Sequence, residues 1–275
     1  MTDFSTSWRG GSGSGGAGTP NGSATPPVPP RQQFTPGPVL LIGPPGVGKG
    51  TQAKALMAVW GVPQISTGDL FRQHRREHTE LGLMADKLME QGQLVPDDLV
   101  TKMVSTRLSE PDCLRGYILD GFPRTLAQVR WLDRYLAETR SRYPVVVISI
   151  QVDRDDLLRR ITGRRICPHG HIYNMYTQPP AVEGECDVDG LPLMQRNDDT
   201  EEVFESRMKV FEEETDPVIS HYRRFGRFGS VDGTQDVDTV TKDIRAKLEW
   251  LRTQETAKTG VHRLSDLMSG IKKAQ

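Results

Sequence analysis

The sequence has few cysteines, no long apolar run and no excess of charge of either sign. Its three cysteines, Cys113, Cys167 and Cys186, are too few for a disulfide framework, which favours a reducing compartment. No apolar run approaches the roughly 20 residues of a membrane-spanning helix. With 35 basic and 36 acidic residues, the net charge of -1 gives no general attraction to nucleic acid or membrane. We therefore expect a cytoplasmic protein that binds neither, and any anion site must come from local clustering of charge.

The first 37 residues are also poor in apolar side chains. They are rich in Gly, Ser, Pro, Thr and Ala, and offer too little apolar surface to offset the entropy of ordering. They lack the apolar run of a secretory signal and the Arg-rich amphipathic period of a mitochondrial presequence. We predict a disordered tail over 1–37, either solvated or serving as a tether or partner-binding segment.

What the sequence does contain is an alternation of short apolar runs with helical stretches. We predict strands at 38–43, 116–122, 145–152 and 228–233, and helices up to Gly61 and over 126–140. This alternation predicts an α/β fold with a parallel sheet, in which ligands bind at the carboxyl ends of the strands. Gly43, Asp120 and Asp232 fall at such ends.

The stretch GPPGVGKGT, Gly43–Thr51, lies between a predicted strand and a predicted helix. Backbone N–H groups in such a loop, together with a helix N-terminus, bind phosphate oxygens. Lys49 is placed to bridge the outer phosphates, and Thr51 to cap the helix or contact phosphate. The hydroxyl comes one residue later than in the usual phosphate-loop pattern. The alternative, a structural glycine-rich turn, accounts less well for the lysine and the flanking elements.

A second group of polar residues follows in QISTGDLFR and LDGFPRTLAQ. If the chain is helical from Leu126, Arg124 and Gln128 lie four residues apart and can share one face. An arginine fork suits a phosphate, and a glutamine amide offers a donor and an acceptor to the edge of adenine. Taken singly, these side chains also fit surface ion pairs or a solvated helix.

Seven motifs together resemble the adenylate kinases: GPPGVGKGTQ, PQISTGDLFR, LDGFPRT, GRR, PPAVEG, QRNDD and VDGT, in that order. The resemblance covers about residues 38–252 and is to the long-lid, bacterial-type members. G-K-G-T is the form of the phosphate loop in this family, so Gly50 is a family trait.

The resemblance implies a phosphotransferase that catalyses ATP + AMP ⇌ 2 ADP with Mg²⁺, and that acts as a monomer. It implies a P-loop NTPase-type three-layer α/β/α fold with a central parallel sheet. It also implies a helical AMP-binding segment at about 66–95 and a lid at about 163–199. The alternatives are another nucleoside monophosphate kinase, a GTP-using AMP kinase and a non-catalytic nucleotide sensor. The sensor is the least supported of these, because the cationic residues are intact.

The resemblance also assigns site residues. The ATP-binding set is Gly46, Val47, Gly48, Lys49, Gly50, Thr51, Arg160, Arg164 and Gln235. The AMP-binding set is Thr67, Arg72, Gln93, Leu94, Val95, Gly121, Arg124, Gln128, Arg196 and Arg207. The catalytic set is Lys49, Asp120, Arg124, Arg160, Arg164, Arg196 and Arg207, in which Asp120 orients Mg²⁺ through water, with Asp69 as a possible helper. Asp198 and Asp199 resemble lid-hinge carboxylates. A cation-rich site of this kind suits phosphoryl transfer, which depends on alignment and charge stabilisation.

The lid departs from the family pattern. Many bacterial lids of this length hold zinc on C-x2-C, sixteen residues, then C-x2-[CD], whereas this chain has Cys167, His169, Cys186 and Asp189 at the matching places. Thiolate, imidazole and carboxylate all bind Zn²⁺, so we expect a structural zinc on these four residues. His171 can replace His169, and a metal-free lid held by hydrogen bonds is the competing interpretation. A Cys167–Cys186 disulfide is disfavoured in the cytosol, and we expect Cys113 to be an ordinary, partly buried thiol.

The last segment, 253–275, lies beyond the resemblance. Val261, Leu264, Leu267, Met268 and Ile271 recur at helical spacing. We expect a helical extension that docks on the core or on a partner, or remains a solvated helix.

Overall fold

The computed structural model describes residues 34–139, 141 and 143–272, and their side chains as far as residue 254. Most of the predicted N-terminal tail, residues 1–33, lies outside the described residues. Residues 34–37 of the predicted tail are described, and the Phe34 ring lies 6.3 Å from that of Trp60. Within the described part of the chain, no helix is both long enough and apolar enough to span a membrane.

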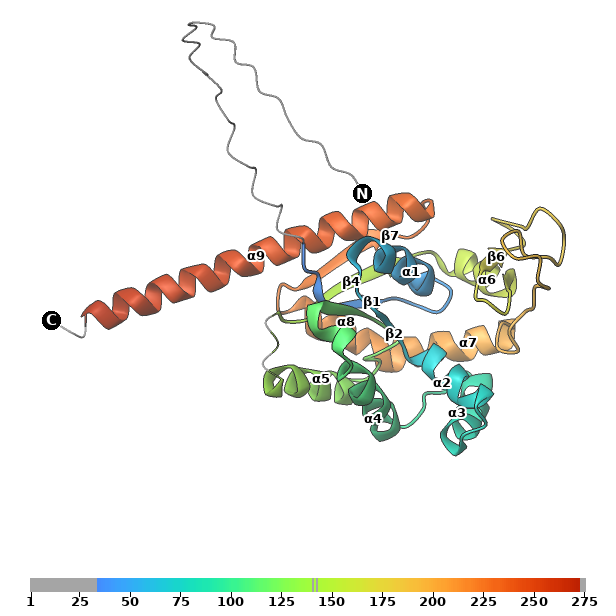
Figure 1. Ribbon diagram of the computed structural model, residues 1–275, viewed down its shortest axis with the longest axis horizontal. Helices are drawn as coiled ribbons and strands as arrows, with labels where there is room; N and C mark the ends of the chain where they lie inside the picture. Colours follow the sequence, from blue (N-terminus) through green and yellow to red (C-terminus); the bar gives the residue numbers. More distant parts are fainter. Residues whose placement is uncertain (1–33, 140, 142, 273–275) are drawn as a thin grey trace, which may run out of the picture. The chain divides into compact units, whose positions relative to one another are not determined.

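A five-stranded parallel sheet forms the centre of the molecule (Figure 1). The strand order is β2-β3-β1-β4-β7, with bounds β1 Gly37–Ile42, β2 Gln64–Ser66, β3 Gly116–Asp120, β4 Val146–Gln151 and β7 Phe228–Asp232. The four long strands are those predicted from apolar runs. The edge strand β2 was missed, because three residues are too few to show a period.

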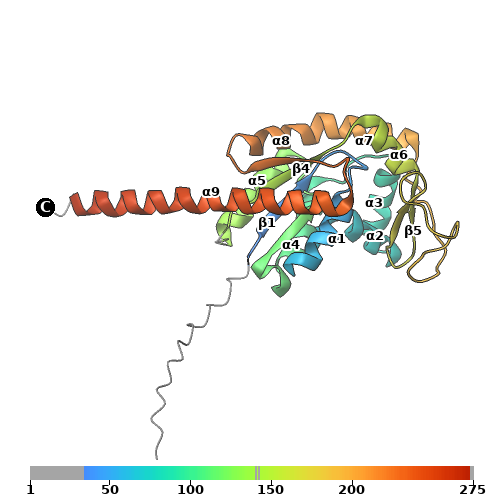
Figure 2. The ribbon, with the colours of Figure 1, turned by 90° about the horizontal axis from the view of Figure 1, so that it is seen from above.

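Helices cover both faces of the sheet (Figures 1 and 2). They are α1 Lys49–Trp60, α2 Thr67–Arg76, α3 Glu80–Glu90, α4 Asp97–Leu108, η1 Pro111–Arg115, α5 Leu126–Glu138, α6 Arg154–Thr162, α7 Glu201–Val210, the π-helical turn η2 Phe211–Thr215, α8 Asp216–Arg223 and α9 Val237–Lys272. The central strand β1 contributes side chains to two hydrophobic cores. Leu40 and Ile42 pack on one face of the sheet, and Val39 and Leu41 pack on the other. The predicted three-layer α/β/α fold is confirmed.

The positions at which α1 and α5 begin determine which of the nearby polar residues lie inside a helix. α1 begins at Lys49 with Gly48 as its N-cap, so Thr51 is the third helical residue and does not cap the helix. α5 begins after Thr125, whose Oγ1 accepts a hydrogen bond from Gln128 N at 3.2 Å. Arg124 therefore precedes the helix, and it still pairs with Gln128, since its backbone N–H donates to Gln128 Oε1 at 2.7 Å.

Two segments extend from this layered core. The segment 163–199 contains an antiparallel hairpin of β5 Arg164–Ile166 and β6 Ile172–Asn174, closed by an antiparallel bridge between Ile166 and Met194. At the other end of the chain, α9 packs on β7, β4 and α1, and its backbone stays helical to Lys272. The apolar side chains predicted to dock, from Val261 to Ile271, lie outside the described side chains.

Candidate active site

The loop between β1 and α1 forms the base of the candidate site. Gly46 and Gly48 have φ of 82° and 99°, in the left-handed region that favours glycine. A Cβ at Gly46 would lie 2.8 Å from Leu157 O, so no larger residue fits there. Lys49 Nζ donates to Gly43 O at 2.8 Å and to Pro44 O at 3.0 Å. The loop is therefore shaped for close backbone approach to a phosphate, with its lysine folded over it.

Lys49 is the electrostatic centre of a cluster of predicted residues. Burial lowers the pKa of its ammonium group to about 8, and the neighbouring guanidinium groups act in the same direction, while Asp120 opposes them. The guanidinium groups that act on it are those of Arg124, Arg164 and Arg207. The structure thus brings together five of the seven residues predicted to be catalytic.

Asp120 ends β3, beside the strand that leads into the phosphate loop. Burial raises the pKa of its carboxyl, against the effect of Lys49 and Arg124. Gln64 Nε2 donates to Asp120 Oδ2 at 3.0 Å and fixes the carboxylate from the edge strand β2. Sequence reasoning missed Gln64, because its role depends on this contact with a residue of another strand.

The other predicted cations also reach this region. Arg160 Nη2 donates to Gly233 O at 2.8 Å and Nη1 to Val47 O at 3.5 Å, so it joins the phosphate loop to the turn after β7. Burial lowers the pKa of Arg196 to about 10, and Arg164 and Arg72 add to this effect. A site with so many cationic side chains attracts a polyanion strongly, once these side chains are no longer paired with carboxylates of the protein.

Three of these arginines are held by carboxylates. Arg164 Nε donates to Asp199 Oδ2 at 2.8 Å, and Asp199 is fully buried. Arg207 donates to Asp198, and Arg72 to Asp69. These carboxylates stand where phosphate oxygens can replace them, since guanidinium groups bind both in the same bidentate manner. Asp69, expected to help with Mg²⁺, here serves as the partner of Arg72.

The predicted acceptor side is held together around the carbonyl of Gly121. Thr67 Oγ1 donates to Gly121 O at 3.0 Å, and Arg124 Nε donates to the same oxygen at 2.9 Å. Arg124 N donates to Gln128 Oε1 at 2.7 Å. The four residues of this group that are predicted to bind AMP therefore form one connected network, from the start of α2 through the β3–α5 loop to α5.

A cavity of about 390 Å³ lies beside this network. It is lined by Gln93, Leu94, Val95, Pro96, Asp97, Thr125, Val210, Glu213 and Glu214. The predicted adenine-lining stretch 93–95 thus forms one wall, and the π-helical turn η2 contributes the opposite residues. The volume is within the usual range of about 300–1,000 Å³ for small-molecule sites.

Gln235 lies apart from these clusters, exposed on the turn after β7, with its Nε2 3.5 Å from Asp243 Oδ2.

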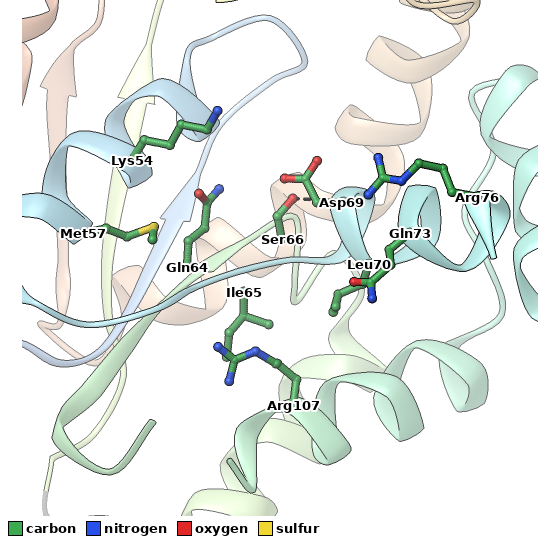
Figure 3. Close-up of a pocket in the computed structure, with 10 residues that line it drawn as sticks. All are labelled: Lys54, Met57, Gln64, Ile65, Ser66, Asp69, Leu70, Gln73, Arg76 and Arg107. Atoms are coloured by element: carbon green, nitrogen blue, oxygen red, sulfur yellow. Dashed lines mark hydrogen bonds between the residues drawn. The ribbon is translucent and has the colours of Figure 1, made fainter. Parts of the chain in front are cut away.

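A second cavity, of about 270 Å³, lies between α1, β2, α2 and Arg107 of α4 (Figure 3). Lys54 and Met57 come to it from α1, and Gln73 and Arg76 from α2. Its lining contains none of the predicted ATP- or AMP-binding residues, so we place the nucleotide site at the phosphate loop.

The β5–β6 hairpin, in the segment predicted to be the lid, lies beside a separate group of side chains of the types that bind metal ions. The ligand atoms of Cys167, His171, Cys186 and Asp189 lie within 4.8 Å of one another. His171 Nδ1 is 3.3 Å from Cys167 Sγ, 3.4 Å from Cys186 Sγ and 3.1 Å from Asp189 Oδ2. His169 Nδ1 is 3.0 Å from Asp189 Oδ2, but the residue lies outside the group. The structure thus favours the second histidine over the one predicted first.

The three cysteines are free thiols, so Cys167 and Cys186 are not joined by a disulfide. Cys113 lies on η1, far along the chain from the lid pair, and is buried. Burial raises the pKa of its thiol to about 11, which disfavours the reactive thiolate, and the residue is more fully buried than expected.

Comparison with known proteins agrees with this geometry. A family model described as adenylate kinase matches residues 41–227. The chain belongs to the adenylate kinase family. The adenylate kinase of Thermosipho melanesiensis is 47% identical over 207 residues, which cover 75% of this chain and 96% of that protein. The adenylate kinase of Caldanaerobacter subterraneus is 46% identical over 211 residues, covering 76% and 95%. That of Archaeoglobus fulgidus is 44% identical over 216 residues, covering 78% and 99%.

The match to the adenylate kinase family model starts inside β1 and ends just before β7. It therefore includes the phosphate loop, the network around Gly121, the lid hairpin and the arginine–carboxylate pairs. The curated adenylate kinases correspond to this chain over almost their whole length, so the family resemblance applies to the complete layered domain.

Proposed function

We propose that this protein catalyses the reversible transfer of the terminal phosphoryl group of ATP to AMP, giving two molecules of ADP. An AMP phosphate oxygen forms a bond to the γ-phosphorus as the bond from that phosphorus to the β–γ bridging oxygen breaks. The observation that carries this proposal is the buried cluster of Lys49, Asp120 and arginines at the phosphate loop, next to a base-sized cavity. Little covalent chemistry is asked of the protein, because alignment and charge stabilisation supply most of the rate.

We assign the cations by their position in the fold. Lys49, Arg160 and Arg164 surround the phosphate loop and would hold the ATP phosphates. Arg72 and Arg124 lie by the Gly121 network and would hold the AMP phosphate, with Arg196 and Arg207 between the two groups. The carboxylate partners of Arg72, Arg164 and Arg207 keep these guanidinium groups in place until phosphates replace them.

Asp120 fits the role of orienting Mg²⁺. It is a buried carboxylate held in place by Gln64 and adjacent to the phosphate-loop lysine. Mg²⁺ usually binds through one or two carboxylates, waters and substrate phosphates, so a single carboxylate suffices. When bound, the ion neutralises charge on the β- and γ-phosphate oxygens.

We also propose that the lid holds a structural Zn²⁺ on Cys167, His171, Cys186 and Asp189, as in the long-lid type. One imidazole, two thiols and one carboxylate within 4.8 Å fit the four-coordinate N, S and O sets that zinc prefers. The metal would join the lid strands and take no part in the chemistry.

The decisive experiment measures ADP formation with ATP and Mg²⁺ on AMP, GMP, UMP and CMP in turn. We expect AMP to be the preferred acceptor, with turnover lost by at least about 100-fold in Lys49→Met, because a transition-state charge stabiliser is removed. Turnover mainly on another monophosphate would replace the acceptor assignment. Absence of turnover in folded protein would favour a nucleotide sensor, and repeating the assay with GTP identifies the donor.

The family resemblance further leads us to propose a monomer, and the free thiols lead us to propose a reducing compartment such as the cytoplasm. Light scattering measures the oligomeric state, and fractionation of cells identifies the compartment.

A further inference from the structure

Asp97, the first residue of α4, contacts one residue of α5 and the residue that caps the N-terminus of α5. Its Oδ1 accepts a hydrogen bond from Gln128 Nε2 at 2.6 Å, and its Oδ2 accepts one from Thr125 Oγ1 at 2.9 Å. Asp97 also lines the cavity beside the Gly121 network. The carboxylate is therefore held in place and touches the glutamine that we assign to base recognition.

The other end of the Gln128 amide is held as well. Gln128 Oε1 accepts from Arg124 N at 2.7 Å, and the residue is only 2% exposed. A glutamine amide has two N–H donors and two acceptor lone pairs. One donor is used by Asp97 and one lone pair by Arg124, so one N–H donor and one lone pair of the amide are left over.

The two partners also decide which way the amide faces. A backbone N–H only donates, and a carboxylate only accepts. Turning the Gln128 amide by 180° would place its NH₂ group against the Arg124 N–H and its oxygen against Asp97. Both contacts would become repulsive, and two buried polar groups would lose their partners. Asp97 and Arg124 therefore hold the amide in one orientation.

We propose that Asp97 is a positioning residue that determines purine specificity through Gln128. This rests on the proposed function and on the predicted role of Gln128 in binding the base of AMP. Held as it is, the amide offers an acceptor and a donor, which match the 6-amino group and N1 of adenine. A 6-oxopurine presents the opposite pattern, an acceptor O6 and a donor N1–H, and meets the amide donor to donor and acceptor to acceptor. Sites built on such pairing reject the wrong analogue strongly, because buried polar groups are left unpaired.

The test compares AMP with inosine monophosphate, which differs from it only at the 6-position and N1. Asp97→Asn keeps the size of the side chain, but its amide can turn either its oxygen or its NH₂ group toward Gln128. The Thr125 hydroxyl does not fix this orientation, because it can rotate to donate to the oxygen or to accept from the NH₂ group. We expect the AMP-to-inosine ratio of kcat/KM to fall by at least about tenfold, mostly through a higher KM for AMP. Since both values come from one preparation, the ratio does not depend on the fraction of folded protein.

Asp98→Asn is the matched control. Asp98 lies next to Asp97 in the same first turn of α4 but is exposed, and the change alters the helix charge equally. We expect its ratio to stay within about twofold of wild type. A double variant adds a second criterion: in Gln128→Ala, where the amide is absent, Asp97→Asn should change the ratio no further.

Dissociation constants of AMP and inosine monophosphate, measured by calorimetry, separate this inference from the proposed function. Binding selectivity that depends on Asp97 without turnover would sink the kinase assignment and leave the inference standing. AMP turnover with an unchanged ratio in Asp97→Asn, or an equal change in Asp98→Asn, would overturn the inference and leave the function standing. A further fall in the ratio in the Gln128→Ala background would show that Asp97 acts on the base without Gln128, and would also overturn it.

Discussion

At the scale of single residues, the pKa of Lys49 near 8 gives the site a pH dependence. Above that pH the ammonium group of the free enzyme loses its proton, whereas bound phosphates favour the charged form. ATP affinity should therefore weaken as pH rises, by about tenfold between about pH 7 and about pH 9, for a group with this pKa. Calorimetric titration of ATP across this range measures the change.

Lys49→Arg is the comparison for this prediction. A guanidinium group keeps its charge over this pH range, so the variant should bind ATP less well at neutral pH but with a nearly flat profile. The same steep profile in Lys49→Arg would show that another group titrates, and would contradict the assignment to Lys49.

Single residues also show where sequence reasoning succeeds. The phosphate-loop lysine and glycines could be predicted, because one continuous motif carries both their chemistry and their backbone geometry. Gln64, Asp97 and the choice of His171 over His169 could not, because each depends on a contact across the fold. His171 enters the metal group because the β5–β6 turn brings its ring beside Cys186 and Asp189, which spacing along the chain does not reveal.

At the scale of elements, one buried arginine adds to the apolar packing that holds α9 on the sheet. Arg252 donates to Pro36 O at 2.8 Å, Pro38 O at 2.9 Å and Pro144 O at 2.6 Å, and its guanidinium lies over the Tyr143 ring. Three carbonyls at the starts of β1 and β4 thus depend on one side chain. Arg252→Met should lower the free energy of unfolding by at least about 3 kcal/mol, since buried acceptors lose their donors.

Urea denaturation measures this loss, and Lys242→Met on the same helix provides the control. Lys242 is exposed, so its replacement should change the unfolding free energy by no more than about 0.5 kcal/mol. Equal losses in the two variants would mean that the charge of α9, and not the carbonyl contacts, supports the domain.

The elements themselves were predictable where they are long and apolar. β1, β3, β4 and β7 are buried runs, and α1 ends at Gly61 with φ of 62°, as its sequence indicates. The short strands β2, β5 and β6 have three residues each, so their pairing depends on neighbours and not on local pattern. The helix predicted over 126–140 begins where expected, as α5 at Leu126 after the cap at Thr125, and ends slightly early, at Glu138.

At the scale of the whole molecule, the lid is a small unit attached to a large one. Its own core consists of Cys167, Tyr173 and Cys186 with two partly buried leucines. The Arg164–Asp199 pair links its two ends, and it is joined to the layered domain by Lys54 Nζ, which donates to Gly170 O at 2.7 Å, and by Asn174 Nδ2, which donates to Arg160 O at 3.0 Å. So small a core supplies little stability without a metal or other crosslink.

We therefore expect purified enzyme to contain about one zinc per chain, with the four ligands argued above. Removing the metal with a chelator should make the segment 163–199 sensitive to protease and lower kcat/KM by about tenfold or more, since the lid excludes water and aligns the phosphates. Added Zn²⁺ should restore both properties. The layered domain keeps its own cores, so its main unfolding transition should shift little.

The two histidines make this prediction specific to one ligand set. His171→Ala should lose the bound metal, whereas His169→Ala, which removes an exposed ring outside the group, should retain it. Loss of metal from His169→Ala alone would restore the ligand set expected from the family spacing. Protein that is free of metal, yet has a protease-resistant lid and full activity, would mean that the hydrogen bonds of His171 with Asp189 and the two thiols suffice to hold the lid.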